Sequence, residues 1–416
     1  MKRSILSLAF ATTILAGLAA GSAHAQGRGI DAIQTVVVIY AENRSFDNLY
    51  GSFPGANGLQ NVKPGQAIQL DRDGTPLKEL PPVWNNLTGK GVTPVVTQAQ
   101  TEHLPNQPFS IDDAKGLNTQ LGVVTHDLWH LFYQNQMQID GGKNDKFVAY
   151  ADSGSLVMGH YDGSKLPLWT IAKQYTLADN FFMAAFGGSF LNHQWLACAC
   201  TPVYPDAENS PAKKLIAAVE ADGVTLKIAD NSPKSAMQGI PKFVNNGQIS
   251  PDGYAVNTMQ PPYQPSAIKP AEGGDARFAD PSKPNVLPPQ HEVTIGDLLS
   301  LKGVSWAWYS GAWQAVLDGK NGHPVPNFQF HHQPYNYFAA YAPGTEARKE
   351  HLKDGGMNGV AFLADVDAGK LPQVTFYKPQ GNLNEHAGYA DVEAGDAHIA
   401  DVIAHLEKSP QWAHML

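Results

Sequence analysis

The stretch VVVIYAENRSFDNLYG, residues 36–51, places a run of β-branched side chains directly before the polar pair Glu42 and Asn43. Such a run is typical of a buried strand, and the polar segment after it favours the start of a helix. Two interpretations of the pair are open. Asn43 can cap the helix that follows, or the carboxylate and the amide can together bind a hard divalent cation.

Strand and helix patterns alternate along the rest of the chain. Strands are expected at 35–42, 175–182, 304–310 and 371–378, and helices at 126–136, 166–174, 294–303 and 396–409. This alternation predicts an α/β protein with a mostly parallel central sheet flanked by helices. In such sheets functional groups gather at the carboxyl ends of the strands.

Residues 203–292 interrupt this alternation, because they are rich in proline and weakly periodic. We expect them to form an inserted lobe or a long loop region within one domain, residues 26–416, without a core of their own. Their position in the chain would allow them to border the active site.

The N-terminus predicts export. Residues 1–25 combine a basic start, a short apolar core and an A-x-A cleavage pattern, which is typical of a secretory signal peptide. No later segment is long and apolar enough for stable membrane insertion, so a periplasmic or secreted protein is expected. The full sequence has a net charge of −9 and no basic cluster, which argues against nucleic acid as a partner.

The chain has two cysteines, Cys198 and Cys200. On a strand, their side chains would share a face with the sulfur atoms too far apart to bond easily, so we expect no disulfide between them. Two thiols are also too few for a structural zinc site.

Several polar motifs could take part in catalysis. HDLWH, residues 126–130, places His126 and His130 four residues apart, as in zinc proteases, but it has Asp127 where those enzymes have glutamate. The sequence GGS ends at Ser189, which is either an ordinary turn serine or a hydroxyl beside a flexible phosphate-binding backbone. It lacks the second glycine of the G-x-S-x-G motif that serine hydrolases use.

The segment AENRSFDNLYG, residues 41–51, resembles the E-N-R-S-F-D-x-x-x-G signature of the bacterial phosphoesterase family of acid phosphatases and phospholipases C. The segment YTLADNFFMAAFGGSFLNH, residues 175–193, is similar to that family's second block. The resemblance implies an alkaline-phosphatase-like fold. It also implies one divalent metal ion at Glu42 and Asn43, and Ser189 as the nucleophile. The histidines that match family active-site positions are His130, His331, His332 and His386.

These residues imply a secreted, metal-dependent phosphoric ester hydrolase that acts through a phosphoserine intermediate. Ser189, and the segment QIDGGKNDKF at 138–147, favour the acid phosphatase type; phospholipase C is the alternative. The substrate is then a small-molecule phosphate ester or a phospholipid head group. Histidines that must be charged favour an acidic pH optimum. The identity of the metal, the general acid among the histidines and the oligomeric state stay open.

The resemblance extends over residues 32–412. In family members a further block similar to TYDENGG follows and supplies acidic metal ligands, whereas this sequence ends at Leu416. We therefore expect a C-terminally truncated member with the last part of the fold missing. Its metal affinity and turnover would be weak, and a catalytically inactive remnant is the second alternative.

Overall fold

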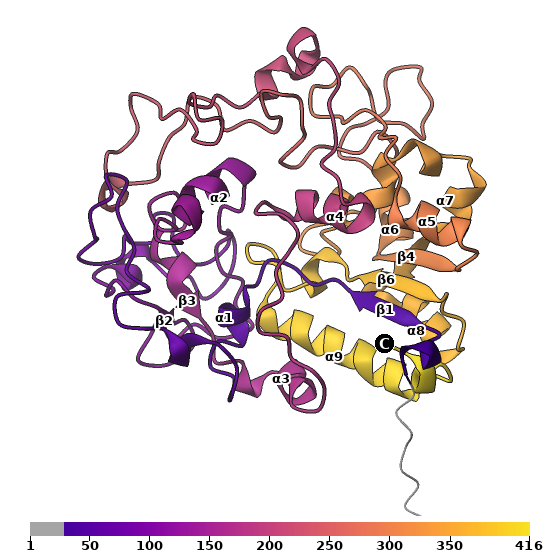
Figure 1. Cartoon of the computed structure of the whole chain (residues 1–416), viewed down its shortest axis with the longest axis horizontal. Helices are drawn as coiled ribbons and strands as arrows, with labels where there is room; N and C mark the ends of the chain where they lie inside the picture. Colours follow the sequence, from indigo (N-terminus) through magenta and orange to yellow (C-terminus); the bar gives the residue numbers. More distant parts are fainter. Residues whose placement is uncertain (1–28) are drawn as a thin grey trace, which may run out of the picture.

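The larger sheet of the described residues is parallel and four-stranded, and it lies toward the right of the molecule in Figure 1. The computed structural model describes residues 29–416, so the predicted signal peptide lies outside the described residues. The strand order is β1-β6-β4-β5, and every pair is parallel. The strands are β1 (Val36–Ile39), β4 (Trp306–Gly311), β5 (Leu352–Gly356) and β6 (Val374–Lys378). The predicted α/β class with a mostly parallel sheet is confirmed.

The helices are α1 (Phe46–Leu49), α2 (Phe132–Ile139), α3 (Pro167–Ala172), α4 (Ser189–Cys198), α5 (Ile295–Leu301), α6 (Trp313–Leu317), α7 (Glu346–His351), α8 (Val360–Asp367) and α9 (Val392–Lys408). Residues of α4, α5 and α7 pack on one face of this sheet, and residues of α8 and α9 pack on the other. A separate two-stranded pair joins β2 (Phe109–Ser110) to β3 (Gly159–His160). Among the described residues, no helix combines the length and the apolar character needed to cross a bilayer.

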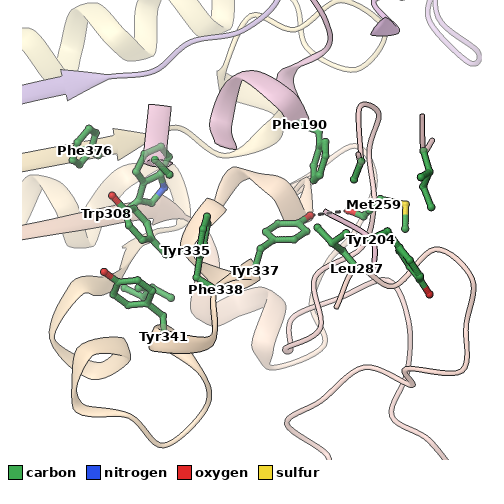
Figure 2. Close-up of a cluster of buried hydrophobic side chains, with 14 of the residues drawn as sticks. Phe190, Tyr204, Met259, Leu287, Trp308, Tyr335, Tyr337, Phe338, Tyr341 and Phe376 are labelled. Carbon is green, nitrogen blue, oxygen red and sulfur yellow. Dashed lines mark hydrogen bonds between the residues drawn. The ribbon is translucent and has the colours of Figure 1, made fainter. Parts of the chain in front are cut away.

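The two sheet faces follow from the alternation of side chains along the strands. Ala307 and Tyr309 of β4 pack with α8 and α9, in a cluster that contains Phe362 and Val402. The intervening Trp308 faces the other way, where it packs in a cluster of mostly aromatic side chains (Figure 2). Both faces are therefore buried, as expected for a parallel sheet.

The predicted elements are mostly confirmed. Thr294 caps α5, accepting a hydrogen bond from the backbone of Asp297, whose carboxylate accepts one in return. Helices α3 and α9 and strands β1, β4 and β6 lie within their predicted ranges or shifted by a few residues. The strand predicted at 175–182 is wrong, because this segment is irregular. Its large apolar side chains Phe181 and Phe182 are exposed.

Residues 203–292 contain only short 3-10 turns and isolated β-bridges. Their apolar side chains Tyr204, Met259 and Leu287 belong to the same buried cluster as Trp308 (Figure 2). The Tyr337 hydroxyl donates a 2.8 Å hydrogen bond to the Met259 carbonyl and ties this region to the chain that follows it. The region therefore shares the core of the sheet.

The expectation that Cys198 and Cys200 do not bond is wrong. They form a disulfide, with their Cα atoms 5.1 Å apart. The expectation assumed an extended strand, but Cys198 is the last residue of α4. Ala199 adopts the left-handed conformation, with φ 49° and ψ 36°, and this tight turn brings the two side chains together.

Candidate active site

The candidate site lies beyond the carboxyl ends of β1 and β6. Glu42 and Asn43 follow β1, and Lys378 ends β6. The backbone of Glu42 donates a 2.9 Å hydrogen bond to the carbonyl of Asn384, in the loop after β6. The adjacent strands thus bring together two segments more than 300 residues apart in sequence.

Glu42 is a buried carboxylate surrounded by cationic and imidazole groups. Its Oε1 atom lies 3.2 Å from Nζ of Lys378 and 3.1 Å from Nε2 of His332. Its Oε2 atom accepts a 3.0 Å hydrogen bond from the Tyr389 hydroxyl. The side chains of Glu42, Lys378 and His332 are at most 1% exposed. A buried charge of this kind requires a partner, and Lys378 provides it.

The charges in this cluster follow from its burial. Burial alone raises the pKa of Glu42, but His332 and Lys378 together lower it well below the ordinary value. Burial lowers the pKa of Lys378 to about 8, against the opposing effect of Glu42. Burial also lowers the pKa of His332. At neutral pH the cluster therefore holds an ionised glutamate, a protonated lysine and a neutral histidine.

Ser189 is the first residue of α4 and lies beside this cluster. Its Oγ atom is 2.9 Å from Nε2 of His331, in the 3-10 turn Phe330–His332. The turn is fixed on β4, because Nε1 of Trp308 donates a 2.8 Å hydrogen bond to the carbonyl of His332. Burial lowers the pKa of His331 well below its ordinary value, so a neutral imidazole faces the serine hydroxyl.

The glycine loop before Ser189 is held by Asn192 on α4. The side-chain amide of Asn192 donates to the carbonyls of Ala185, Gly187 and Gly188. A Cβ atom on Gly188 would lie 2.7 Å from the carbonyl oxygen of His130. In this structure the glycine therefore permits a close approach of the His130 backbone.

A second group of side chains lies around His386. The Asn43 amide nitrogen donates a 2.8 Å hydrogen bond to Nε2 of His386, and Nδ1 of His386 contacts the carbonyl of Ala387. The rings of His130 and His386 have centroids 5.2 Å apart. Burial lowers the pKa of His386 to about 3. Asp127, whose pKa burial raises to about 6, lies 3.5 Å from Nδ1 of His130.

The structure decides between two earlier alternatives. The helix cap is Ser45, whose side chain accepts from the backbone of Asn48, so the interpretation of Asn43 as the cap is wrong. The helix predicted at 126–136 is partly wrong, because α2 begins only at Phe132. His126 and His130 therefore do not share a helix face as the zinc-protease pattern requires.

Two further residues of the site were missed in the sequence. His193 is fully buried, its ring stacks on that of His332 with centroids 5.3 Å apart, and its Nδ1 atom lies 2.7 Å from the carbonyl of Ser189. The sequence feature that could have identified His193 is its position four residues after Ser189, because residues with this spacing share a helix face. Lys378 had a signal too, since it is a charged residue at the end of an apolar strand pattern.

Two groups in the described chain offer enough donors to hold a metal ion. One consists of Glu42, His331 and His332, and the other of Asp127, His130 and His386. Within residues 29–416, neither ring nitrogen of His332 has a hydrogen-bond partner, and Glu42 Oε1 has none with acceptable angles. Buried oxygen and nitrogen atoms without hydrogen-bond partners are suitable ligands for a divalent cation. Lys378 already places one positive charge beside Glu42.

Comparison with known proteins identifies the class. The model of the Phosphoesterase family matches residues 33–416, and the chain belongs to this family. The chain is similar to phospholipase C B of Mycobacterium tuberculosis, with 24% identity over 392 residues, 91% of this chain and 56% of that relative. It is 25% identical to phospholipase C A of the same species over 182 residues, 42% of this chain and 31% of that relative. The chain thus spans about half of the length of phospholipase C B and about a third of the length of phospholipase C A.

Proposed function

We propose that the chain hydrolyses phosphate esters with Ser189 as the nucleophile. The observation that carries the proposal is the 2.9 Å contact between the Ser189 Oγ and the neutral Nε2 of His331, beside the Glu42 cluster. A serine hydroxyl becomes an effective nucleophile when an adjacent base accepts its proton. In this scheme Ser189 attacks phosphorus, the ester oxygen leaves, and water then hydrolyses the phosphoserine.

His130 is the histidine best placed to protonate the leaving oxygen. Nδ1 of His130 contacts the carbonyl of Leu128, and its ring lies against Gly188, next to the nucleophile. In His386 the corresponding Nε2 atom already accepts from Asn43. His386 and Asn43 then position each other, and Glu42 with His332 and Lys378 fixes the charge beside the reacting group.

We propose that one divalent ion binds at this site, with Glu42 and His332 as its first candidate ligands and Asn43 next in sequence to Glu42. Such an ion would screen the phosphate charge and lower the pKa of a bound hydroxyl. The unsatisfied ring nitrogens of His332 and the buried Glu42 Oε1 support this assignment.

The expected substrate is a phospholipid head group, because the matched relatives are named phospholipase C. This revises the preference for an acid phosphatase, which rested on Ser189 and residues 138–147. A pH optimum set by charged histidines also finds less support, since burial lowers the pKa of His331 and His386. We retain phosphomonoester hydrolysis as the second candidate, since the family resemblance includes acid phosphatases.

The test compares the parent chain with Ser189→Ala on phosphatidylcholine vesicles and on p-nitrophenyl phosphate, each with added Zn²⁺, Mn²⁺ or Ca²⁺. We expect Ser189→Ala to reduce turnover at least about 10³-fold. The exposed Ser52→Ala should leave it unchanged. Release of phosphocholine without p-nitrophenol supports phospholipase C, and the reverse supports an acid phosphatase. Equal turnover by the parent and Ser189→Ala would remove the serine from the mechanism.

We also propose that the protein is exported and that its fold is of the alkaline-phosphatase type. A disulfide between Cys198 and Cys200 supports an oxidising compartment. The parallel sheet with the site at its carboxyl edge supports the fold assignment. Turnover of neither substrate would favour the non-catalytic alternative.

A further inference from the structure

A cavity of about 610 Å³ lies away from the proposed catalytic side chains. It is bounded by α6, by α7 and the residues just before it, and by part of the irregular region at 264–277. Its volume falls in the range of small-molecule sites, about 300–1,000 Å³. None of the proposed catalytic residues lines it, although Phe330, next to His331 in sequence, does.

Arg348 of α7 lines this cavity without an anionic partner. Its guanidinium donates to three neutral oxygens: the side chain of Asn336 at 2.8 Å, and the carbonyls of Tyr341 and Gln264 at 3.0 and 2.8 Å. Among the described residues no acceptor meets Nε, and no carboxylate forms an ion pair with Arg348. Burial lowers its pKa to about 10, so the side chain stays charged at neutral pH.

Arg277 adds a second cationic group to the same cavity. Its Nε and Nη2 atoms pair with Asp275, which does not line this cavity. In the described chain its Nη1 atom has no hydrogen-bond partner, and it lies 3.6 Å from the Cβ position of Gly344. Asp275 offsets part of its charge, so Arg348 is the stronger contributor.

The remaining lining is mostly apolar and contains no acidic side chain within the described residues. Leu317 and Phe330 provide the apolar surface, and Gln264 and Asn321 add polar groups. The chain as a whole carries a formal charge of −9. Two arginines thus line this cavity, with no carboxylate among its lining residues, in a chain of net negative charge.

We propose that this cavity binds an organic anion. A phosphate or carboxylate group pairs with Arg348 and Arg277, and an apolar body lies on Leu317 and Phe330. Guanidinium groups favour such planar oxygen pairs, because their N–H donors match the spacing of two anionic oxygens. This site is separate from the one proposed for ester hydrolysis, and it does not depend on that function.

The test is titration calorimetry of the full chain at pH 7 with phenylphosphonate and, separately, with benzoate. Ala276 lines the cavity and is exposed, so Ala276→Glu places a carboxylate beside the arginines, and Ala276→Gln is its uncharged match. We expect Ala276→Glu to weaken binding at least tenfold and Ala276→Gln to change it less than twofold. The probe that binds more tightly identifies the anion as phosphate-like or carboxylate-like.

Binding that Ala276→Glu does not weaken would assign the anion to the Ser189 site and overturn the proposal. So would the absence of heat with both probes. If Ala276→Glu does not fold, Pro270→Glu against Pro270→Gln repeats the comparison from another exposed residue that lines the cavity. Loss of binding only in the glutamate variant would support the site, and equal binding would reject it.

Discussion

At the scale of single residues, the site depends on one buried ion pair. Glu42 and Lys378 are both almost inaccessible to solvent and 3.2 Å apart; Glu42 follows β1, and Lys378 is the last residue of β6. Removing one partner of a buried pair leaves an uncompensated charge, which costs about 3–5 kcal/mol. The pair therefore couples the geometry of the site to the stability of the sheet.

We predict that Lys378→Met lowers the free energy of unfolding by about 3–5 kcal/mol, because it leaves the Glu42 carboxylate buried and unpaired. The double variant with Glu42→Gln should recover much of this loss, since it removes the second charge as well. Urea denaturation measures both. Lys349→Met, at an exposed pair with Glu346, serves as the control and should change stability by less than about 1 kcal/mol. Additive losses in the double variant would show that the pair is not coupled.

A second prediction concerns Glu385, next to His386. Burial, reinforced by Asp396, raises the pKa of Glu385 to about 7, and burial raises the pKa of Asp396 to about 6. Both folded-state values lie above the unfolded values near 4. Between about pH 4 and 7 the folded state thus binds more protons than the unfolded state, and its stability falls as the pH rises.

We therefore expect a higher melting temperature at pH 5 than at pH 8, and a smaller difference in Glu385→Gln. Between pH 5 and 8 Glu385 should contribute on the order of 2–3 kcal/mol, because over most of this range only the unfolded state is ionised. Calorimetric melting of both proteins over this pH range measures it. Equal pH dependence in the parent and the variant would mean that Glu385 ionises without cost in the folded state.

The sequence was sufficient to select residues that lie close together, but it did not define their contacts. The family signature selected Glu42 and Ser189, and the structure places His331 beside both. Lys378 escaped selection, because a lysine at a strand end is usually exposed and only the tertiary fold shows it buried. His193 was also missed, and its neighbours His332 and Glu42 come from other segments of the chain.

At the scale of elements, prediction succeeded where local chemistry determines structure. Helix α5 begins at its capping box, Thr294 with Asp297, which the sequence alone indicates. Prediction failed at residues 126–131, expected to be helical, and at 175–182, expected to form a strand, because both segments are irregular. The prediction that Cys198 and Cys200 do not bond also failed, because the left-handed turn at Ala199 was not evident from the sequence.

Helix α5 also provides a prediction at this scale. Gly296 faces Trp306 of β4 so closely that an added Cβ atom would lie 2.2 Å from the indole ring. Gly296→Ala should therefore lower stability by about 1–3 kcal/mol through overpacking, despite the better helix propensity of alanine. Thermal unfolding measures the change. Leu301→Ala, at an exposed position of the same helix, should have little effect, and a stabilised Gly296→Ala would show that the contact relaxes freely.

At the scale of the whole molecule, the irregular region and the sheet share one buried cluster. Tyr204, Met259 and Leu287 from residues 203–292 pack with Trp308 and Phe376 from the sheet (Figure 2). The sequence predicted an insertion from its proline content. It could not show what the insertion packs against, because irregular segments have no periodicity that marks a buried face.

We predict that residues 203–292 unfold together with the sheet. If residues 203–292 opened independently of the sheet, a protease would cleave them before global unfolding. If they belong to the shared core, they are protected until the whole chain unfolds. Limited proteolysis across a urea series, followed by mass spectrometry, should show the first cleavages in this region at the same urea concentration at which Trp fluorescence changes. Tyr337→Phe, which removes the 2.8 Å hydrogen bond to Met259, should shift both transitions equally, by about 1–3 kcal/mol. A shift in proteolysis alone would show that the region opens independently of the sheet, and it would then be free to move relative to the proposed site.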